Sequence, residues 1–298
     1  MKNGLIIIDK EEGMSSHTAV SKVRRLLGAE KAGHTGTLDP MATGVLPVLI
    51  GRGVKASEYM LTSDKHYIAK LLLGVTTDTE DVTGEILSRS NKVPTEAEVA
   101  LAIRSMLGES LQTPPMYSAL KVGGKKLCDL AREGKTVDRE PRKITVYSIA
   151  YKRIGDVEYE LDVKCSKGTY IRTLCADIGK KLGTGGVMKA LRRAEASGFT
   201  LSDAIKISEL ELLSEEERAA RILPTETVFR NEKSVTLSPF FSRLARCGVE
   251  IYLKKLGISL EVGERVTLFD EKGFFALGEV REFPDGAAIK PIKQFDTN

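Results

Sequence analysis

The segment Gly33-His34-Thr35-Gly36-Thr37-Leu38-Asp39-Pro40-Met41-Ala42-Thr43-Gly44 decides how this chain is interpreted. Three glycines and one proline interrupt any helical or strand pattern, so the segment predicts an ordered loop. The loop carries one carboxylate, Asp39, and one histidine, His34. An Asp-Pro step is usually only a turn, because Asp hydrogen-bonds the following backbone and proline fixes the next φ. Asp39 therefore needs support from elsewhere in the chain before it can be assigned chemistry.

Periodic segments flank this loop. Leu5 to Ile8 predicts a short buried strand. Ser16 predicts the N-cap of a helix whose apolar residues lead to Gly28 as its C-cap. After the loop, residues 45–50 and 66–73 predict two further strands, the second containing Tyr67.

Two later segments show clear patterns. Thr95 and Glu98 form a capping box, which predicts the start of a structural helix. Residues 157–165 alternate between apolar and mostly polar, as in a half-buried strand, and lead into a helix that begins near Ile171. Arg172 falls about 100° from Ile171 around that helix. It therefore lies off the apolar stripe and is free to point toward a cleft.

Length and composition suggest two domains. A chain of 298 residues with 42% hydrophobic residues exceeds the usual domain size of roughly 100 to 200 residues. The acidic stretch 210–232 predicts an exposed helix and linker, and short strands with Gly and Asp turns over 249–292 predict a small β-rich module. We expect a large domain over residues 1–232 and a small one over 233–298.

Compartment and cofactors are indicated mainly by missing patterns in the sequence. It has no apolar run of the roughly 20 residues that a membrane span needs, and its first nine residues are too short for a signal peptide. We expect a cytoplasmic protein with four free, mostly buried cysteines. It has neither a dinucleotide-binding nor a phosphate-loop glycine motif, and its three histidines lack metal-ligand spacing. We expect no cofactor and no metal.

Positive charge is concentrated in two segments. Residues 121–143 hold eight basic and four acidic side chains, and residues 164–193 hold eight basic side chains against Asp177 alone, although the whole chain carries only +4. Concentrated Lys and Arg favour a surface that follows phosphates, while a solvated face is the commoner explanation of any single run.

The loop from Gly33 to Pro47 resembles the signature of the bacterial tRNA pseudouridine synthase B (TruB) family. The resemblance continues in family order through residues 65–67, 114–121 and 166–172, and it spans roughly residues 4 to 205. The chain departs from the family pattern at residues 194–199, after Leu-Arg-Arg. The last 60 or so residues resemble, in general character, the small PUA-like RNA-binding module of that family.

The resemblance implies a fold and a reaction. The fold is α+β, the pseudouridine synthase fold with a mainly antiparallel central sheet in residues 1–232, plus a PUA-like domain in 233–298. The reaction converts uridine 55 in the T-loop of tRNA to pseudouridine by breaking the N-glycosidic bond, turning the uracil and joining C5 to C1′. It needs no cofactor and no metal. The partner is the T-arm of tRNA, with neither a membrane nor an obligate protein partner.

The resemblance also implies catalytic roles. Asp39 is the nucleophile, and Arg172 pairs with it to favour and orient the charged form. Tyr67 stacks on the uracil near C5, where a proton must leave. From the residues alone, Arg172 could equally be another phosphate contact, and Tyr67 could be a core residue.

Further residues are expected around the bound RNA. His34 fills the space left by the flipped uridine, or else hydrogen-bonds its own turn. Leu191 lines the uracil pocket, with Tyr170, Lys10 and Gly36 as other substrate contacts. The RNA-binding residues share a basic side chain, and most belong to an insertion at about 115–143 that would act as a mobile flap: Lys121, Lys125, Lys126, Arg132, Arg142 and Arg193.

Two other functions remain open at this point. A phosphodiesterase using Asp39 and His34 would shorten RNA, but the chain offers no further carboxylate cluster for the metals that often drive such chemistry. A binding module without chemistry would also be basic. It would have no need of an aspartate beside bound RNA, where negative charge opposes phosphate.

Overall fold

The computed structural model describes residues 3–295. Ten strands form one large sheet: β1 (Gly4–Lys10), β2 (Ala32–His34), β3 (Thr43–Ile50), β4 (Lys65–Leu73), β7 (Gly108–Gln112), β10 (Arg142–Arg153), β11 (Glu158–Cys165), β12 (Gly186–Ala196), β13 (Phe199–Thr200) and β14 (Ile205–Lys206). Two small hairpins join β5 (Val75–Thr77) to β6 (Ile86–Arg89) and β8 (Lys121–Val122) to β9 (Lys125–Lys126).

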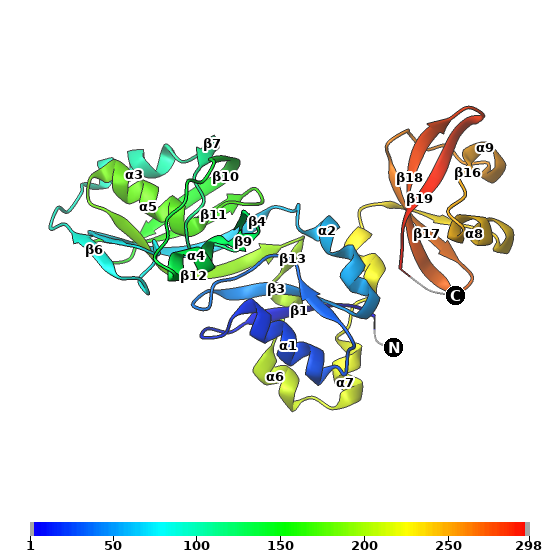
Figure 1. Ribbon diagram of the computed structural model, residues 1–298, viewed down its shortest axis with the longest axis horizontal. Helices are drawn as coiled ribbons and strands as arrows, with labels where there is room; N and C mark the ends of the chain where they lie inside the picture. The colour runs from blue at the N-terminus through cyan, green and yellow to red at the C-terminus, as the bar shows by residue number, and fades with distance from the viewer. Residues whose placement is uncertain (1–2, 296–298) are drawn as a thin grey trace.

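Short helices accompany this sheet. The α-helices are α1 (Ser16–Leu26), α2 (Ser57–Met60), α3 (Glu96–Arg104), α4 (Leu127–Arg132), α5 (Ile171–Leu182), α6 (Ile207–Leu212) and α7 (Glu215–Ala220). The 3-10 turns are η1 (Gly51–Ala56), η2 (Leu201–Asp203) and η3 (Thr225–Phe229). Helix α5 packs on β12 and β4, whereas α1 packs on β2 and β3, so the two helices serve different halves of the sheet (Figure 1).

The large sheet runs in the order β14, β1, β3, β12, β4, β11, β10, β7, with β2 beside β3 and β13 beside β12. Only the β1–β14 and β3–β12 pairs are parallel. Strands 66–73 and 157–165 were predicted and lie here as β4 and β11, paired antiparallel. The predicted α+β fold with a mainly antiparallel central sheet is confirmed. The pairing of β3 with β12 brings the loop before β3 close to two arginines near the end of β12.

The start of α1 corrects one sequence prediction. Ser15, not Ser16, is the N-cap: its backbone is extended and its side chain accepts a hydrogen bond from the Thr18 N–H. At the other end Leu27 is the C-cap, and Gly28 follows it with a left-handed φ of 60°. Two consecutive serines both fit the cap pattern, so the pattern alone could not separate them.

The predicted loop 33–44 is also shorter than expected. Its first two residues, Gly33 and His34, pair with Leu49 and Val48 in β2 and β3, so the irregular part begins after His34. At its far end Gly44 has a φ of 104°, and a Cβ there would lie 2.2 Å from the Arg193 carbonyl oxygen. The close approach of β12 therefore requires glycine at this position.

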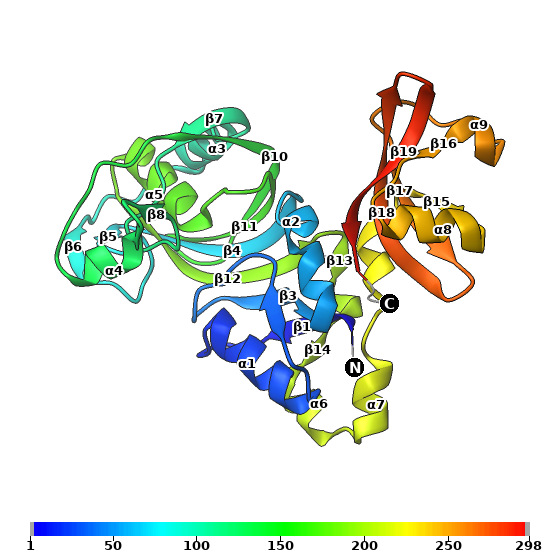
Figure 2. The same cartoon turned by 45° about the vertical axis from the view of Figure 1, so that its right-hand side comes forward.

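The last part of the chain forms a separate β-rich module. Its five-stranded sheet contains β15 (Lys233–Thr236), β16 (Ile251–Tyr252), β17 (Arg265–Asp270), β18 (Gly273–Phe283) and β19 (Gly286–Gln294), with helices α8 (Pro239–Arg246) and α9 (Leu253–Leu256) beside it. Figure 2 shows this module as a lobe next to the part that contains the large sheet. The prediction of a small β-rich C-terminal module is confirmed.

The connection between the two parts is packed rather than loose. The acidic stretch 210–232 was predicted as an exposed helix and linker, yet Leu210 and Phe229 are buried. The Phe229 ring lies 5.2 Å from the Tyr59 ring and 5.5 Å from the Phe295 ring, measured between centroids. Apolar contacts therefore tie the linker to both parts of the molecule.

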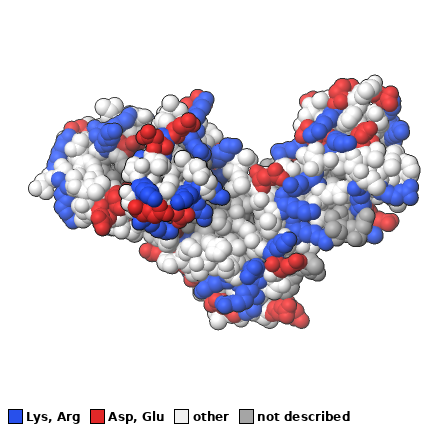
Figure 3. Space-filling view, viewed as in Figure 1, with Lys and Arg blue, Asp and Glu red and all other residues white. Residues whose placement is uncertain are grey.

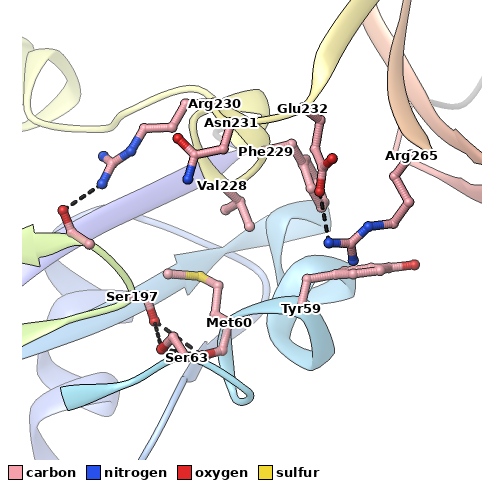
Figure 4. A pocket seen from close by; sticks show the side chains of 11 residues that line it. Tyr59, Met60, Ser63, Ser197, Val228, Phe229, Arg230, Asn231, Glu232 and Arg265 are labelled. Atoms are coloured by element: carbon pink, nitrogen blue, oxygen red, sulfur yellow. Dashed lines mark hydrogen bonds and ion pairs between the residues drawn. The ribbon is translucent and has the colours of Figure 1, made fainter. Parts of the chain in front are cut away.

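A pocket of about 270 Å³ lies beside this connection (Figure 4). Met60, Val228 and Phe229 form its apolar side, and Arg265 pairs there with Glu232 at 2.8 Å. The pocket residues include none of the predicted catalytic side chains. Within residues 3–295, no helix combines the length and apolarity that a membrane crossing requires.

Candidate active site

Asp39 and Arg172 come together although 133 positions separate them in the chain. Arg172 Nε lies 3.0 Å from Asp39 Oδ2, and Nη2 donates to Oδ1 at 3.4 Å. The guanidinium fork thus faces both carboxylate oxygens, which fixes the orientation of the carboxylate. The Arg172 side chain is only 6% exposed, whereas the Asp39 side chain keeps 33% exposure. A reactant can therefore reach Asp39 while its partner stays buried.

Opposing effects set the charge state of Asp39. Burial raises the pKa of its carboxyl above the ordinary value, the charges of Arg172 and Lys10 lower it, and Asp81 raises it. The expectation that Arg172 favours the ionised form has the right sign for the pair, but burial outweighs the pair. The net effect is a more basic carboxylate than a solvent-exposed aspartate.

Arg172 is anchored on the side away from Asp39. Its Nη1 donates to the Thr79 carbonyl at 3.1 Å and its Nη2 donates to the Tyr117 carbonyl at 2.7 Å. Nη1 also lies 3.8 Å from Oδ2 of Asp81, a buried carboxylate whose Oδ1 accepts from the Thr83 N–H at 2.9 Å. The guanidinium is thereby held in one rotamer and faces two carboxylates.

The helix that carries Arg172 is fixed at its first residue. Gln112 at the end of β7 is buried, donates from Nε2 to the Tyr170 carbonyl at 3.1 Å and accepts from the Tyr170 N–H at 2.8 Å. Tyr170 is the N-cap of α5 but its side chain provides no cap. Gln112 therefore satisfies backbone groups that the start of the helix leaves open and sets where Arg172 begins. The burial of Tyr170, predicted as a substrate contact, raises the pKa of its phenol.

Lys10 is fully buried under the Asp39 loop. Its Nζ donates to the carbonyls of Glu11 at 3.0 Å, Met14 at 2.8 Å and Pro40 at 3.2 Å. Burial lowers its pKa to about 8, and the Asp39 carboxylate works against that shift. Lys10 was predicted to contact substrate, but its amine is committed to these backbone carbonyls, one of which follows Asp39 directly.

Tyr67 and Arg193 lie directly opposite each other on β4 and β12. The Tyr67 phenol is nearly buried, and burial raises its pKa while the adjacent Arg193 guanidinium lowers it. Asp39 is close enough for its charge to act on the same phenol. The structure thus groups Tyr67 with Asp39 and Arg172 at one end of the sheet.

Arg193 corrects the prediction of an RNA contact. It is 1% exposed, its Nε donates to the Val45 carbonyl at 2.7 Å, and its Nη2 donates to the Gly36 carbonyl at 3.2 Å. These two carbonyls lie on either side of the Asp39 loop, so Arg193 connects the two ends of the loop. A side chain this deeply buried does not reach an external phosphate. Gly36, predicted as a substrate contact, is held here with a φ of 114°.

His34 and Leu191 lie at the edge of this group. His34 is half-buried on β2, and burial lowers the pKa of its imidazole, so the ring is neutral at pH 7. Its Nδ1 is buried without a hydrogen-bond partner among the described residues. Leu191 is 8% exposed on β12, opposite Ala69 of β4.

The basic insertion is partly ordered around its hairpin. Gly123 and Gly124 form the turn between β8 and β9 with φ values of 57° and 84°, and Leu127 buries the start of α4. The predicted RNA-binding side chains other than Arg193 are exposed: Lys121, Lys125, Lys126, Arg132 and Arg142. The insertion is linked to the catalytic residues at its base, because the Tyr117 carbonyl accepts from Arg172.

Charge is also visible beyond the insertion. Figure 3 shows a notch between the part with the large sheet and the C-terminal module, with Lys and Arg side chains along the side of the notch that the module forms. Within residues 3–295 no group of three or more His, Cys, Asp or Glu side chains is arranged to hold a metal ion.

Sequence reasoning missed Asp81 and Gln112. Asp81 lies in the turn between β5 and β6, in a Thr79-Glu80-Asp81-Val82-Thr83 stretch that looks like ordinary turn chemistry. Gln112 closes an exposed edge strand and immediately precedes the proline-rich segment 113–115. No local signal distinguishes either residue, since their roles depend on contacts with α5.

Comparisons with known proteins agree with this geometry. Residues 24–171 match the model described as TruB family pseudouridylate synthase (N terminal domain), and residues 172–230 match the tRNA pseudouridylate synthase B C-terminal domain. Proteins named tRNA pseudouridine synthase B are 44% identical in Alkaliphilus oremlandii, covering 94% of this chain and 93% of that protein, and 42% identical in Methylobacillus flagellatus, covering 93% and 91%. A chain in the crystal structure of a Cbf5-Nop10-Gar1 complex is 26% identical with a TM-score of 0.71, covering 99% of this chain and 85% of that one.

Proposed function

Because the chain belongs to the TruB family of pseudouridylate synthases, we propose that it isomerises uridine 55 in the T-loop of tRNA to pseudouridine, with Asp39 as the nucleophile. The observation that carries the proposal is the Asp39–Arg172 pair: a one-third exposed carboxylate held on both oxygens by a buried guanidinium. A binding module would have no use for a negative charge fixed in this way beside RNA.

The reaction needs little from the protein beyond position and charge. The bond between N1 and the ribose breaks, the uracil turns, C5 joins C1′ and the C5 proton leaves, with no net oxidation and no added group. Asp39 acts in its ionised form. Arg172 keeps that form oriented, and its own bonds to Thr79 and Tyr117 prevent it from following the carboxylate if the latter moves.

Tyr67 is the group we assign to the C5 side of the uracil. Its phenol is close enough to Asp39 for the two charges to interact. Burial keeps the phenol protonated at neutral pH, so its first role is to pack against the flipped base. Accepting the C5 proton would require Arg193, directly opposite on β12, to stabilise the phenolate.

The uridine has to leave its stack before it can reach Asp39, which costs a few kcal/mol. The neutral, half-buried ring of His34 is suited to stack in the vacated space, and Leu191 supplies an apolar wall for the uracil. The exposed lysines of the β8–β9 hairpin supply phosphate contacts that offset part of the cost. We assign the C-terminal module a further contact with the RNA, through the basic side of the notch in Figure 3.

The test uses an unmodified tRNA transcript. It is incubated with purified protein, and pseudouridine is mapped by carbodiimide labelling and primer extension. We expect one new mark at uridine 55, which disappears when the transcript has cytidine at that position. A mark at another uridine would refute the assigned site, and intact, unmarked RNA would leave the binding module as the better explanation.

A further inference from the structure

Ser16 does not cap a helix in this structure, although it sits beside the residue that does. It occupies the first helical position of α1, where Ser15 already provides the cap. Its side chain is 2% exposed and points away from the helix axis toward the Asp39 loop. A buried hydroxyl requires partners, and the partners of Ser16 lie 22 residues away.

Both partners belong to one residue, Leu38. Ser16 Oγ donates to the Leu38 carbonyl at 2.9 Å and accepts from the Leu38 N–H at 2.8 Å. Leu38 lies in neither a helix nor a strand, and its side chain is 3% exposed. One hydroxyl thus satisfies both backbone groups of the residue before Asp39.

The residue after Asp39 is held from the same segment of chain. The Pro40 carbonyl accepts from the Gly13 N–H at 2.9 Å and from Lys10 Nζ at 3.2 Å. Residues 38 and 40 are therefore fixed on both sides of Asp39 by the segment 10–16, while the Asp39 side chain is left to Arg172. A displacement of this segment would move the carboxylate relative to the guanidinium.

We propose that Ser16 is a positioning residue that holds the Asp39 carboxylate at its reactive distance by fixing the Leu38 peptide groups. The inference rests on the proposed function, since it concerns the nucleophile of that reaction. A misplacement of about 1 Å in a catalytic group can lower a rate about 100-fold. Loss of the Ser16 hydroxyl should therefore lower kcat by about 10- to 100-fold and leave KM for tRNA within about threefold.

Ser15 supplies a matched control one position away. Ser15→Ala removes the N-cap and should lower Tm by about 2–4 °C, but it leaves Leu38 untouched and should leave kcat unchanged. Ser16→Ala should lower both Tm and kcat. Ser16→Thr keeps the hydroxyl and should recover most of kcat, whereas Ser16→Cys, with similar size and weak hydrogen bonds, should not.

The pH profile separates positioning from general loss of structure. Arg172 lowers the pKa of Asp39, so a carboxylate that moves away from it becomes more basic. The acid limb of kcat in Ser16→Ala should move to higher pH, whereas a smaller folded fraction would lower the whole curve without moving it. If Ser16→Ala does not fold, Ser16→Cys provides the same comparison.

Asp39→Asn measured alongside keeps the two ideas distinguishable. Activity in Asp39→Asn overturns the proposed function itself. An inactive Asp39→Asn together with wild-type kcat and an unmoved acid limb in both Ser16→Ala and Ser16→Cys overturns only the role of Ser16.

Discussion

Arg172→Ala removes the cation that faces Asp39. A hydrogen bond to a charged group contributes about 1.5–3 kcal/mol. The structure gives Arg172 one short contact with Asp39, at 3.0 Å, and one long contact, at 3.4 Å. Counting the second at less than half, and allowing for the one-third exposure of Asp39, the loss is about 2–4 kcal/mol. Since 1.4 kcal/mol is tenfold, kcat should fall by about 30- to 1000-fold.

The assay is single-turnover pseudouridine formation with enzyme in excess over tRNA, at several pH values. Without the guanidinium the pKa of Asp39 rises further. Only the ionised form reacts, so activity is lost as pH falls through that pKa, and the acid limb should move to higher pH. Arg172→Lys keeps the charge but cannot reach Asp39 and the Thr79 and Tyr117 carbonyls together, so it should be intermediate.

A matched control exists in the C-terminal module. Arg246 and Asp270 form a pair at 2.7 Å with both side chains nearly buried. Arg246→Lys should lower Tm and leave the single-turnover rate of the folded protein unchanged. Equal rate losses in Arg246→Lys and Arg172→Lys, or an unmoved acid limb in Arg172→Ala, would refute the reasoning.

Three further outcomes are expected. Tyr67→Phe keeps the buried ring and removes the phenol, so single-turnover rates should fall by about 10²-fold or more if the phenol takes part in proton transfer and should barely change if it only packs. Lys125→Gln with Lys126→Gln should lower the salt dependence of tRNA affinity by about one unit of slope for each phosphate that the variant no longer neutralises, with kcat unchanged; an unaltered slope would remove the hairpin from the RNA surface. In the wild-type protein the acid limb of kcat should lie at higher pH than for an exposed aspartate, because burial raises the pKa of Asp39; a limb below about pH 4 would contradict this.

Local patterns predicted the elements well where each element carries its own period. The alternation over 157–165 and the capping box at Thr95 and Glu98 both correspond to what the structure has, in β11 and α3. The cap of α1 was wrong by one residue, since consecutive serines satisfy the same pattern. Gly33 and His34 were assigned to a loop because glycine weakens a strand pattern, but their pairing with β3 outweighs that local preference.

The candidate site depended on contacts that no local pattern contains. Asp39 and Arg172 were connected through the family resemblance, and the structure places them in contact. Charge patterning predicted Arg193 on the surface, but the Val45 and Gly36 carbonyls satisfy its guanidinium inside the protein. Asp81 was missed because its partner belongs to a helix far away in the sequence.

The most direct test of the account is tritium release from tRNA that carries [5-³H]uridine, followed in a single turnover with wild-type protein and with Asp39→Asn. The substitution removes the charge and keeps the shape, so tRNA binding should persist. The account predicts release of one tritium for each uridine 55 with the wild-type protein and none above background with Asp39→Asn. Release by Asp39→Asn at a rate near that of the wild type would contradict the assignment of Asp39 as the nucleophile.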